Sequence, residues 1–263
     1  MIRDITIGQY YPVSSAVHKL DPRTKIIVTF IYIISLFFIN YLVGYVFVAA
    51  ALYSAIKISK VPLSFMLKGL KGIMFILLFT VVLNVFFTQG GNVIFSFGFL
   101  TITQQGILTA VMMGARLILL IVGSSLLTLT TSPIELTDGI EALLNPFRRF
   151  GVPAHEIAMM MSISLRFIPI LLEETDKIMK AQMARGADFE TGNIVKRAKA
   201  MIPIMVPLFI SAFRRAEELA MAMEARCYRG GVGRTRMNSL QYRRPDIYAF
   251  IIGVLFMIGC ILF

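Results

Sequence analysis

Long apolar runs alternate with shorter polar stretches along the chain. The runs cover residues 26–41, 42–56, 72–88, 106–131 and 247–263. A helix crosses the hydrocarbon core of a bilayer with about 20 predominantly apolar residues, and these runs approach or exceed that length. The pattern therefore predicts an all-α, polytopic membrane protein with about five transmembrane helices, the first two forming a tight hairpin.

Lysine and arginine residues gather in alternate loops between these runs. Four precede the first run and four lie between the second and the third: Arg3, Lys19, Arg23 and Lys25, then Lys57, Lys60, Lys68 and Lys71. The stretch 88–105 and the tail after Asp246 carry no charged residue. Cytoplasmic loops of membrane proteins are enriched in Lys and Arg. We therefore expect a multi-pass membrane protein with the amino terminus inside and the carboxyl terminus outside.

This topology divides the chain into three parts. Residues 1–131 form a membrane part with four spans, residues 132–245 form a cytoplasmic helical segment, and residues 246–263 form the fifth span. The cytoplasmic segment holds 17 of the 26 Lys and Arg residues. Charge accumulation of this kind supports its placement inside the cell.

Two further apolar runs lie within the cytoplasmic segment, at residues 157–172 and 201–213. The first contains Arg166 and Pro169, and the second is too short to span. A model with seven spans would also place many charged residues outside the cell. We expect both runs to be interfacial or partner-facing halves of long helices.

The cytoplasmic segment contains signals for three helices. Residues 132–135, Ser-Pro-Ile-Glu, have the pattern of a capping box at a helix start, and this first helix should end near Gly151. The second helix should run from Pro153 to Arg185, with a kink at Pro169 and a left-handed cap at Gly186.

A third helix should begin after Asn193, bend around Pro203 and Pro207, and end at Gly230 and Gly231. The second and third helices share a plan, because each has an apolar first half and a charged second half. The segment should therefore contain two long kinked helices.

Each of the two long helices carries an Ala-Arg-small triplet near its end. The triplets are Ala184, Arg185 and Gly186, and, 41 residues later, Ala225, Arg226 and Cys227. An Arg at the carboxyl end of a helix ordinarily complements the helix macrodipole. Alternatively, each Arg protrudes between small residues so that acceptor groups of a partner can bind its guanidinium group. The duplication favours a partner with two similar halves.

Composition limits the other possibilities. Hydrophobic residues make up 57% of the chain and charged residues only 16%. The formal net charge of +11 follows the membrane topology and does not form a nucleic-acid-binding patch. His18, His155, Cys227 and Cys260 are isolated, so the sequence predicts no metal site, no cofactor and no disulfide. A phosphate-binding G-x-x-x-x-G-K-[ST] loop is also missing from the sequence.

Arg116 lies within the fourth apolar run. An ionisable group at membrane depth is a candidate functional residue by default. It could also be structural, with its side chain snorkelling or bonding backbone carbonyls.

Several stretches make the chain similar to a known family, the transmembrane T components of energy-coupling factor transporters. The stretch from His18 to Lys25 resembles the family's amino-terminal signature, and residues 126–172 resemble its coupling region. The two triplets match its paired Arg motifs, with Cys227 in place of Gly in the second. The resemblance covers most of the chain.

The resemblance implies a non-catalytic scaffold, or coupling subunit, of an ECF-type ABC importer of vitamins or transition-metal ions, located in a prokaryotic cell (inner) membrane. Arg185 and Arg226, with their small neighbours, would dock into two ATP-binding cassette ATPase subunits. The spans and apolar helix halves would hold a separate substrate-binding membrane S component. The chain has 16 Met residues, and flexible Met-rich surfaces suit several partners, so we hypothesise interchangeable S components. The alternative is a stand-alone secondary transporter or channel whose path Arg116 lines.

Overall fold

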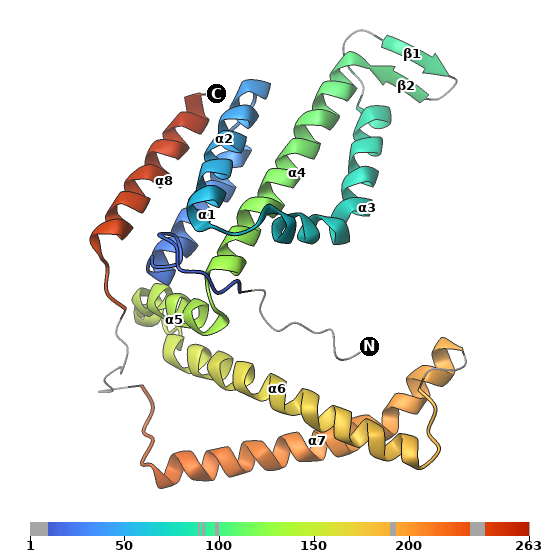
Figure 1. The fold of residues 1–263 in the computed structure, drawn as a ribbon, viewed down its shortest axis with the longest axis vertical. Helices are drawn as coiled ribbons and strands as arrows, with labels where there is room; N and C mark the ends of the chain where they lie inside the picture. Colours follow the sequence, from blue (N-terminus) through green and yellow to red (C-terminus); the bar gives the residue numbers. More distant parts are fainter. Residues whose placement is uncertain are drawn as a thin grey trace. The chain divides into compact units, whose positions relative to one another are not determined.

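The computed structural model describes residues 10–88, 90, 93–97, 100–189, 193–231 and 240–262. The expected inward-facing Arg3 and the glycine at position 192 lie outside the described residues. Most of the described chain is helical (Figure 1), which confirms the predicted all-α polytopic class. The chain divides into two compact units. The first contains the described residues of 8–139 and 239–263, and the second those of 140–238.

Five helices build the first unit, and the central one is α4. They are α1 (Pro22–Phe37), α2 (Leu42–Ser59), α3 (Leu63–Phe87), α4 (Gln104–Thr130) and α8 (Arg244–Leu262). α4 packs against α1, α2 and α3, and α8 packs against α1. Apolar side chains such as Leu36, Val48 and Leu129 fill the interior, while others such as Phe75 on α3 are fully turned outward. An apolar exterior is what a lipid environment requires.

The helices long and apolar enough to cross a membrane differ in part from the expected set. By length and composition, the described residues contain five: α2, Gly69–Phe87 of α3, α4, α8 and α6 (Ala154–Ala184). α1 has 16 residues, which gives about 24 Å at 1.5 Å per residue. It starts four residues before the expected run because Asp21 accepts a hydrogen bond from the Arg23 backbone N–H and caps the helix. The interfacial placement of α6 stays a prediction.

A β-hairpin connects α3 to α4, where the sequence indicated only an uncharged loop. Its strands are β1 (Val93–Phe97) and β2 (Leu100–Thr103), paired antiparallel. Thr103 is buried and caps α4, since its hydroxyl accepts a hydrogen bond from the Gly106 backbone N–H. The same hydroxyl donates to the carbonyl of Thr88. The hairpin is thus joined to the ends of both helices.

α5 (Pro133–Leu144) follows, and the predicted capping box is present at its start. The Ser132 backbone N–H donates to the Glu135 carboxylate at 3.1 Å, and the Glu135 N–H donates to the Ser132 hydroxyl at 3.3 Å. A short 3-10 helix, η2 (Asn145–Phe150), continues from α5, and Gly151 ends it with φ of 86°. The division between the two units falls inside α5.

The second unit consists mainly of two long helices, α6 (Ala154–Ala184) and α7 (Ile194–Ala225), which pack against each other (Figure 1). Pro169 lies inside α6, and Pro203 and Pro207 lie inside α7, as the sequence indicated. The predicted end of the third helix was wrong. α7 ends at Ala225, five residues before Gly230, because Cys227 adopts a left-handed conformation that ends the helix there.

Candidate functional site

The two Ala-Arg-small triplets form the same helix-ending structure. In the first, Ala184 is the last helical residue, Arg185 is the C-cap, and Gly186 is left-handed with φ of 86°. The N–H of Gly186 donates to the carbonyl of Met183 at 2.9 Å, and the N–H of Ala187 donates to that of Gln182 at 3.0 Å. These two bonds define a Schellman motif. The predicted left-handed cap at Gly186 is confirmed.

The second triplet repeats this arrangement residue by residue. Ala225 ends α7, Arg226 is the C-cap, and Cys227 is left-handed with φ of 55°. The N–H of Cys227 donates to the Glu224 carbonyl at 2.8 Å, and the N–H of Tyr228 donates to the Met223 carbonyl at 3.0 Å. A small third residue is therefore required by the backbone in both triplets, because bulky side chains are disfavoured in the left-handed region.

All six triplet residues are exposed. Within the part of the chain that the structure describes, the guanidinium groups of Arg185 and Arg226 have no hydrogen-bond or ion-pair partner. Both lie at carboxyl-terminal helix ends, so the macrodipole interaction is available to them. Their free donors are equally available to carboxylate or carbonyl groups of another protein.

An ion pair between α6 and α7 lies at the same sequence distance from both triplets. Arg215 Nη2 of α7 lies 3.4 Å from Glu174 Oε2 of α6. Eleven residues separate Glu174 from Arg185, and eleven separate Arg215 from Arg226. At 1.5 Å per residue, each triplet is about 16 Å along its helix from this contact. The two Arg residues thus occupy matched positions on a pair of crossing helices.

The triplet of α7 also borders a groove within the second unit. Its volume is about 510 Å³. Its lining comes from α6, from α7 and from the residues after α7: Met159, Ile163, Leu219, Met223, Arg226, Cys227, Tyr228, Arg229 and Gly230. The first half of α6 therefore lies beside the end of α7.

Arg116 forms two hydrogen bonds within the first unit. Its Nε donates to the Tyr45 hydroxyl at 3.1 Å, and its Nη2 donates to the Ile39 carbonyl at 3.1 Å. These contacts connect α4 to α2 and to the turn between α1 and α2. Bonding of a backbone carbonyl was one of the two roles expected for this residue. The contacts give no support to the alternative in which Arg116 lines a transport path.

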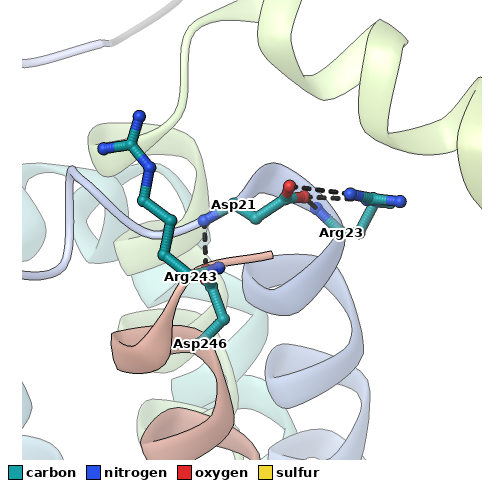
Figure 2. Close-up of polar contacts among 4 residues, drawn as sticks. All are labelled: Asp21, Arg23, Arg243 and Asp246. Carbon is teal, nitrogen blue, oxygen red and sulfur yellow. Dashed lines mark hydrogen bonds and ion pairs between the residues drawn. The ribbon is translucent and has the colours of Figure 1, made fainter. Parts of the chain in front are cut away.

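A cluster of charged residues at the starts of α1 and α8 gave no recognisable signal in the sequence. Figure 2 shows Asp246 next to the backbone of Asp21. The Asp21 N–H donates a hydrogen bond to the Asp246 carboxylate at 2.8 Å. The Arg243 N–H donates to the other carboxylate oxygen at 2.7 Å. Only 1% of Asp246 is exposed. One buried carboxylate therefore holds the amino-terminal ends of two helices together.

Asp21 forms the second half of this cluster. Its carboxylate accepts two hydrogen bonds from the Arg23 guanidinium, at 3.0 and 2.9 Å (Figure 2). Burial opposes ionisation of Asp21, but these bonds and the nearby positive charges outweigh it and hold its pKa below the ordinary value. The Arg23 guanidinium also lies over the ring of Tyr242, 3.9 Å from its centroid.

The amino-terminal segment also binds the end of α4. The Lys25 ammonium is buried and donates to the carbonyls of Thr130 at 2.8 Å and His18 at 3.0 Å. The Tyr11 N–H donates to the Leu129 carbonyl at 2.9 Å. Carbonyls at the end of a helix have no partner within it, so these donors satisfy groups that would otherwise be orphaned. Part of the family-like signature thus has a structural function.

Among the described residues, no three His, Cys, Asp or Glu side chains lie close enough together to hold a metal ion. The functional features of the fold are therefore the pair of Arg-ended helices and the apolar membrane helices. They define a multi-pass helical membrane protein with a pair of long helices that end in exposed Arg residues.

Comparison with known proteins identifies the family. A family model described as "CbiQ: Cobalt transport protein" matches residues 13–238. The energy-coupling factor transporter transmembrane protein EcfT of Ruminiclostridium cellulolyticum is 59% identical over 100% of this chain and 98% of its own length. The EcfT of Clostridium kluyveri is 56% identical over 95% and 93%, and that of Bacillus subtilis 48% over 100% and 98%. The chain therefore belongs to the EcfT family and is the transmembrane component of an energy-coupling factor transporter, a multi-pass protein of the cell membrane.

Proposed function

We propose that this chain is the non-catalytic scaffold that couples two ATP-binding cassette ATPases to a substrate-binding membrane subunit. The observation that carries the proposal is the repeated helix end, in which Arg185 and Arg226 are exposed C-caps of two matched Schellman motifs. Each Arg docks into a groove on one ATPase subunit. Closing and opening of the ATPases then moves α6 and α7, and the movement reaches the membrane subunit.

The remaining surfaces supply the other contacts of this assembly. Several apolar side chains between residues 201 and 213 of α7 are exposed, including Ile202 (58%), Phe209 (66%) and Phe213 (62%). Exposed apolar area on this scale is typical of a surface that binds a partner or a membrane. We assign it to a substrate-binding S component, one or several in turn, that imports a vitamin or a transition-metal ion. The second unit and the amino terminus are cytoplasmic, and the carboxyl terminus is outside.

Replacing both Arg185 and Arg226 by Glu tests the docking role. The double variant should insert and fold normally but lose the ATPase subunits during affinity purification, and with them ATP-driven uptake. A matched control, Lys180→Glu with Arg214→Glu, makes the same change in charge at two exposed positions of α6 and α7. It should retain the ATPases. Retention of the ATPases by the Arg185→Glu, Arg226→Glu variant would refute the proposal.

A further inference from the structure

The groove beside Arg226 combines an apolar lining with positive charge. Met159 and Ile163 of α6 and Leu219 and Met223 of α7 line it, and all four are partly exposed. Burial of these side chains by another protein would remove apolar area from water, which favours binding. Methionine side chains are flexible, so a surface containing two of them adapts to the shape of an inserted group.

Arg226 and Arg229 are the charged residues of the groove, and both are exposed. Two guanidinium groups beside an apolar lining are complementary to a carboxylate next to an apolar side chain. A cavity of roughly 150 Å³ holds a benzene ring. The groove, at about 510 Å³, therefore admits a large side chain, including an aromatic one.

We propose that this groove is a receptor for an ATPase subunit, which inserts a large apolar side chain flanked by a carboxylate. The inference rests on the proposed function and extends it. Arg226 enters a groove of the ATPase, and a side chain of the same ATPase enters the groove beside Arg226. Docking at this end of the helix pair is then reciprocal.

The end of α6 carries different chemistry at the equivalent positions. With the offset of 41 residues, Gln182 corresponds to Met223, Ala187 to Tyr228, and Asp188 to Arg229. An apolar, an aromatic and a basic residue at the α7 end are thus replaced by an amide, a small residue and an acidic one. The inserted side chain is therefore specific to the ATPase that binds at Arg226.

Thiol labelling tests whether the groove is occupied in the complex. Cys260 is 0% exposed, so replacing Cys227 by Ala gives a background with no accessible thiol among the two Cys residues. In this background, Met159→Cys places a thiol in the groove. Met160→Cys, at the neighbouring residue with 57% exposure, places one outside the groove lining. The full chain is labelled with a maleimide, alone and after purification with its ATPase subunits.

We expect the ATPases to slow labelling of Met159→Cys at least tenfold and that of Met160→Cys less than twofold. Equal labelling rates for Met159→Cys in both states would overturn the groove proposal. If labelling rates are equal but the ATPases still co-purify with the chain, only the groove proposal fails and the proposed docking function stands. Failure of the unsubstituted chain to retain ATPases would overturn both proposals.

Filling the groove gives an independent measurement. Ile163→Trp adds a large side chain to the lining, and Ser162→Trp adds the same side chain at the preceding exposed position, which is not part of the lining. Ile163→Trp should weaken ATPase retention at least tenfold while Arg226 is intact, and Ser162→Trp should leave it unchanged. Normal retention by Ile163→Trp, with an unchanged elution profile, would contradict insertion of a partner side chain.

Discussion

Cys227 is the residue at which the repeated helix end departs from its ideal form. Its φ of 55° lies in the left-handed region, whereas the equivalent residue of α6 is a glycine. A side chain in this region costs about 1 kcal/mol relative to glycine, because Cβ crowds the following carbonyl. Cys227→Gly should therefore stabilise the end of α7.

The expected gain is about 1 kcal/mol, or roughly 2–4 °C in the unfolding midpoint if the second unit unfolds with the rest. Thermal unfolding of the purified full chain in one detergent measures it. Cys227→Ala is the control, since it removes the thiol but keeps Cβ, and it should match the original chain. Equal midpoints for the glycine and alanine variants would show that backbone strain at position 227 is negligible.

At the scale of elements, Asp246 fixes the start of α8 to the start of α1. Its buried carboxylate accepts hydrogen bonds from the backbone N–H groups of Asp21 and Arg243. Each buried donor left without an acceptor costs about 1–3 kcal/mol. Asp246→Ala should lower the free energy of unfolding by several kcal/mol, and Asp246→Asn, which keeps one acceptor oxygen, should lower it less.

Protease resistance of the purified chain in detergent, with cleavage mapped by mass spectrometry, measures this effect. Early cleavage next to α8 is the expected result for Asp246→Ala. Tyr242→Phe is a suitable control because it keeps the ring under the Arg23 guanidinium and leaves both carboxylates in place. The same cleavage rate in the original chain, Asp246→Ala and Tyr242→Phe would show that α8 is held by packing alone.

The elements differ in how far the sequence could predict them. Long apolar runs predicted α2, α4 and α8 nearly in place, and the capping box at Ser132 predicted the start of α5, because these signals are local. For α3 only the end was predicted well, since the helix starts at Leu63, nine residues before the expected run, and includes Lys68 and Lys71 of the expected loop. The end of α7 was missed because the left-handed residue is Cys227 rather than a glycine.

Contacts between distant residues were not predictable at all. The hydrogen bond between Asp21 and Asp246 joins positions 225 residues apart, and a single acidic residue before an apolar run says nothing of its partner. The Arg185 and Arg226 positions were found only because a duplicated pattern is visible in the sequence itself. That both triplets form a Schellman motif could be seen only in the structure.

At the scale of the molecule, the proposed function requires α6 and α7 to hold Arg185 and Arg226 in a fixed relation to each other. The ion pair between Glu174 and Arg215 lies eleven residues before each of them. A rotation of a few degrees at this contact displaces each helix end by about 1–2 Å, given arms of about 16 Å. The pair is partly exposed, so its contribution to stability is only about 0 to 1 kcal/mol. Its importance should therefore lie in geometry.

Reversing one charge of this pair should uncouple transport from ATP hydrolysis without dissociating the complex. For Arg215→Glu, repulsion from Glu174 should separate the helices at their contact. The substrate imported per ATP hydrolysed should fall several-fold in proteoliposomes, while ATPase retention and the unfolding midpoint change little. Adding Glu174→Arg restores opposite charges and should restore coupling. Arg214→Glu is the control, because Arg214 pairs with Glu218 within α7. Normal transport by Arg215→Glu, or no recovery of coupling in the exchanged pair, would show that this contact does not set the positions of Arg185 and Arg226.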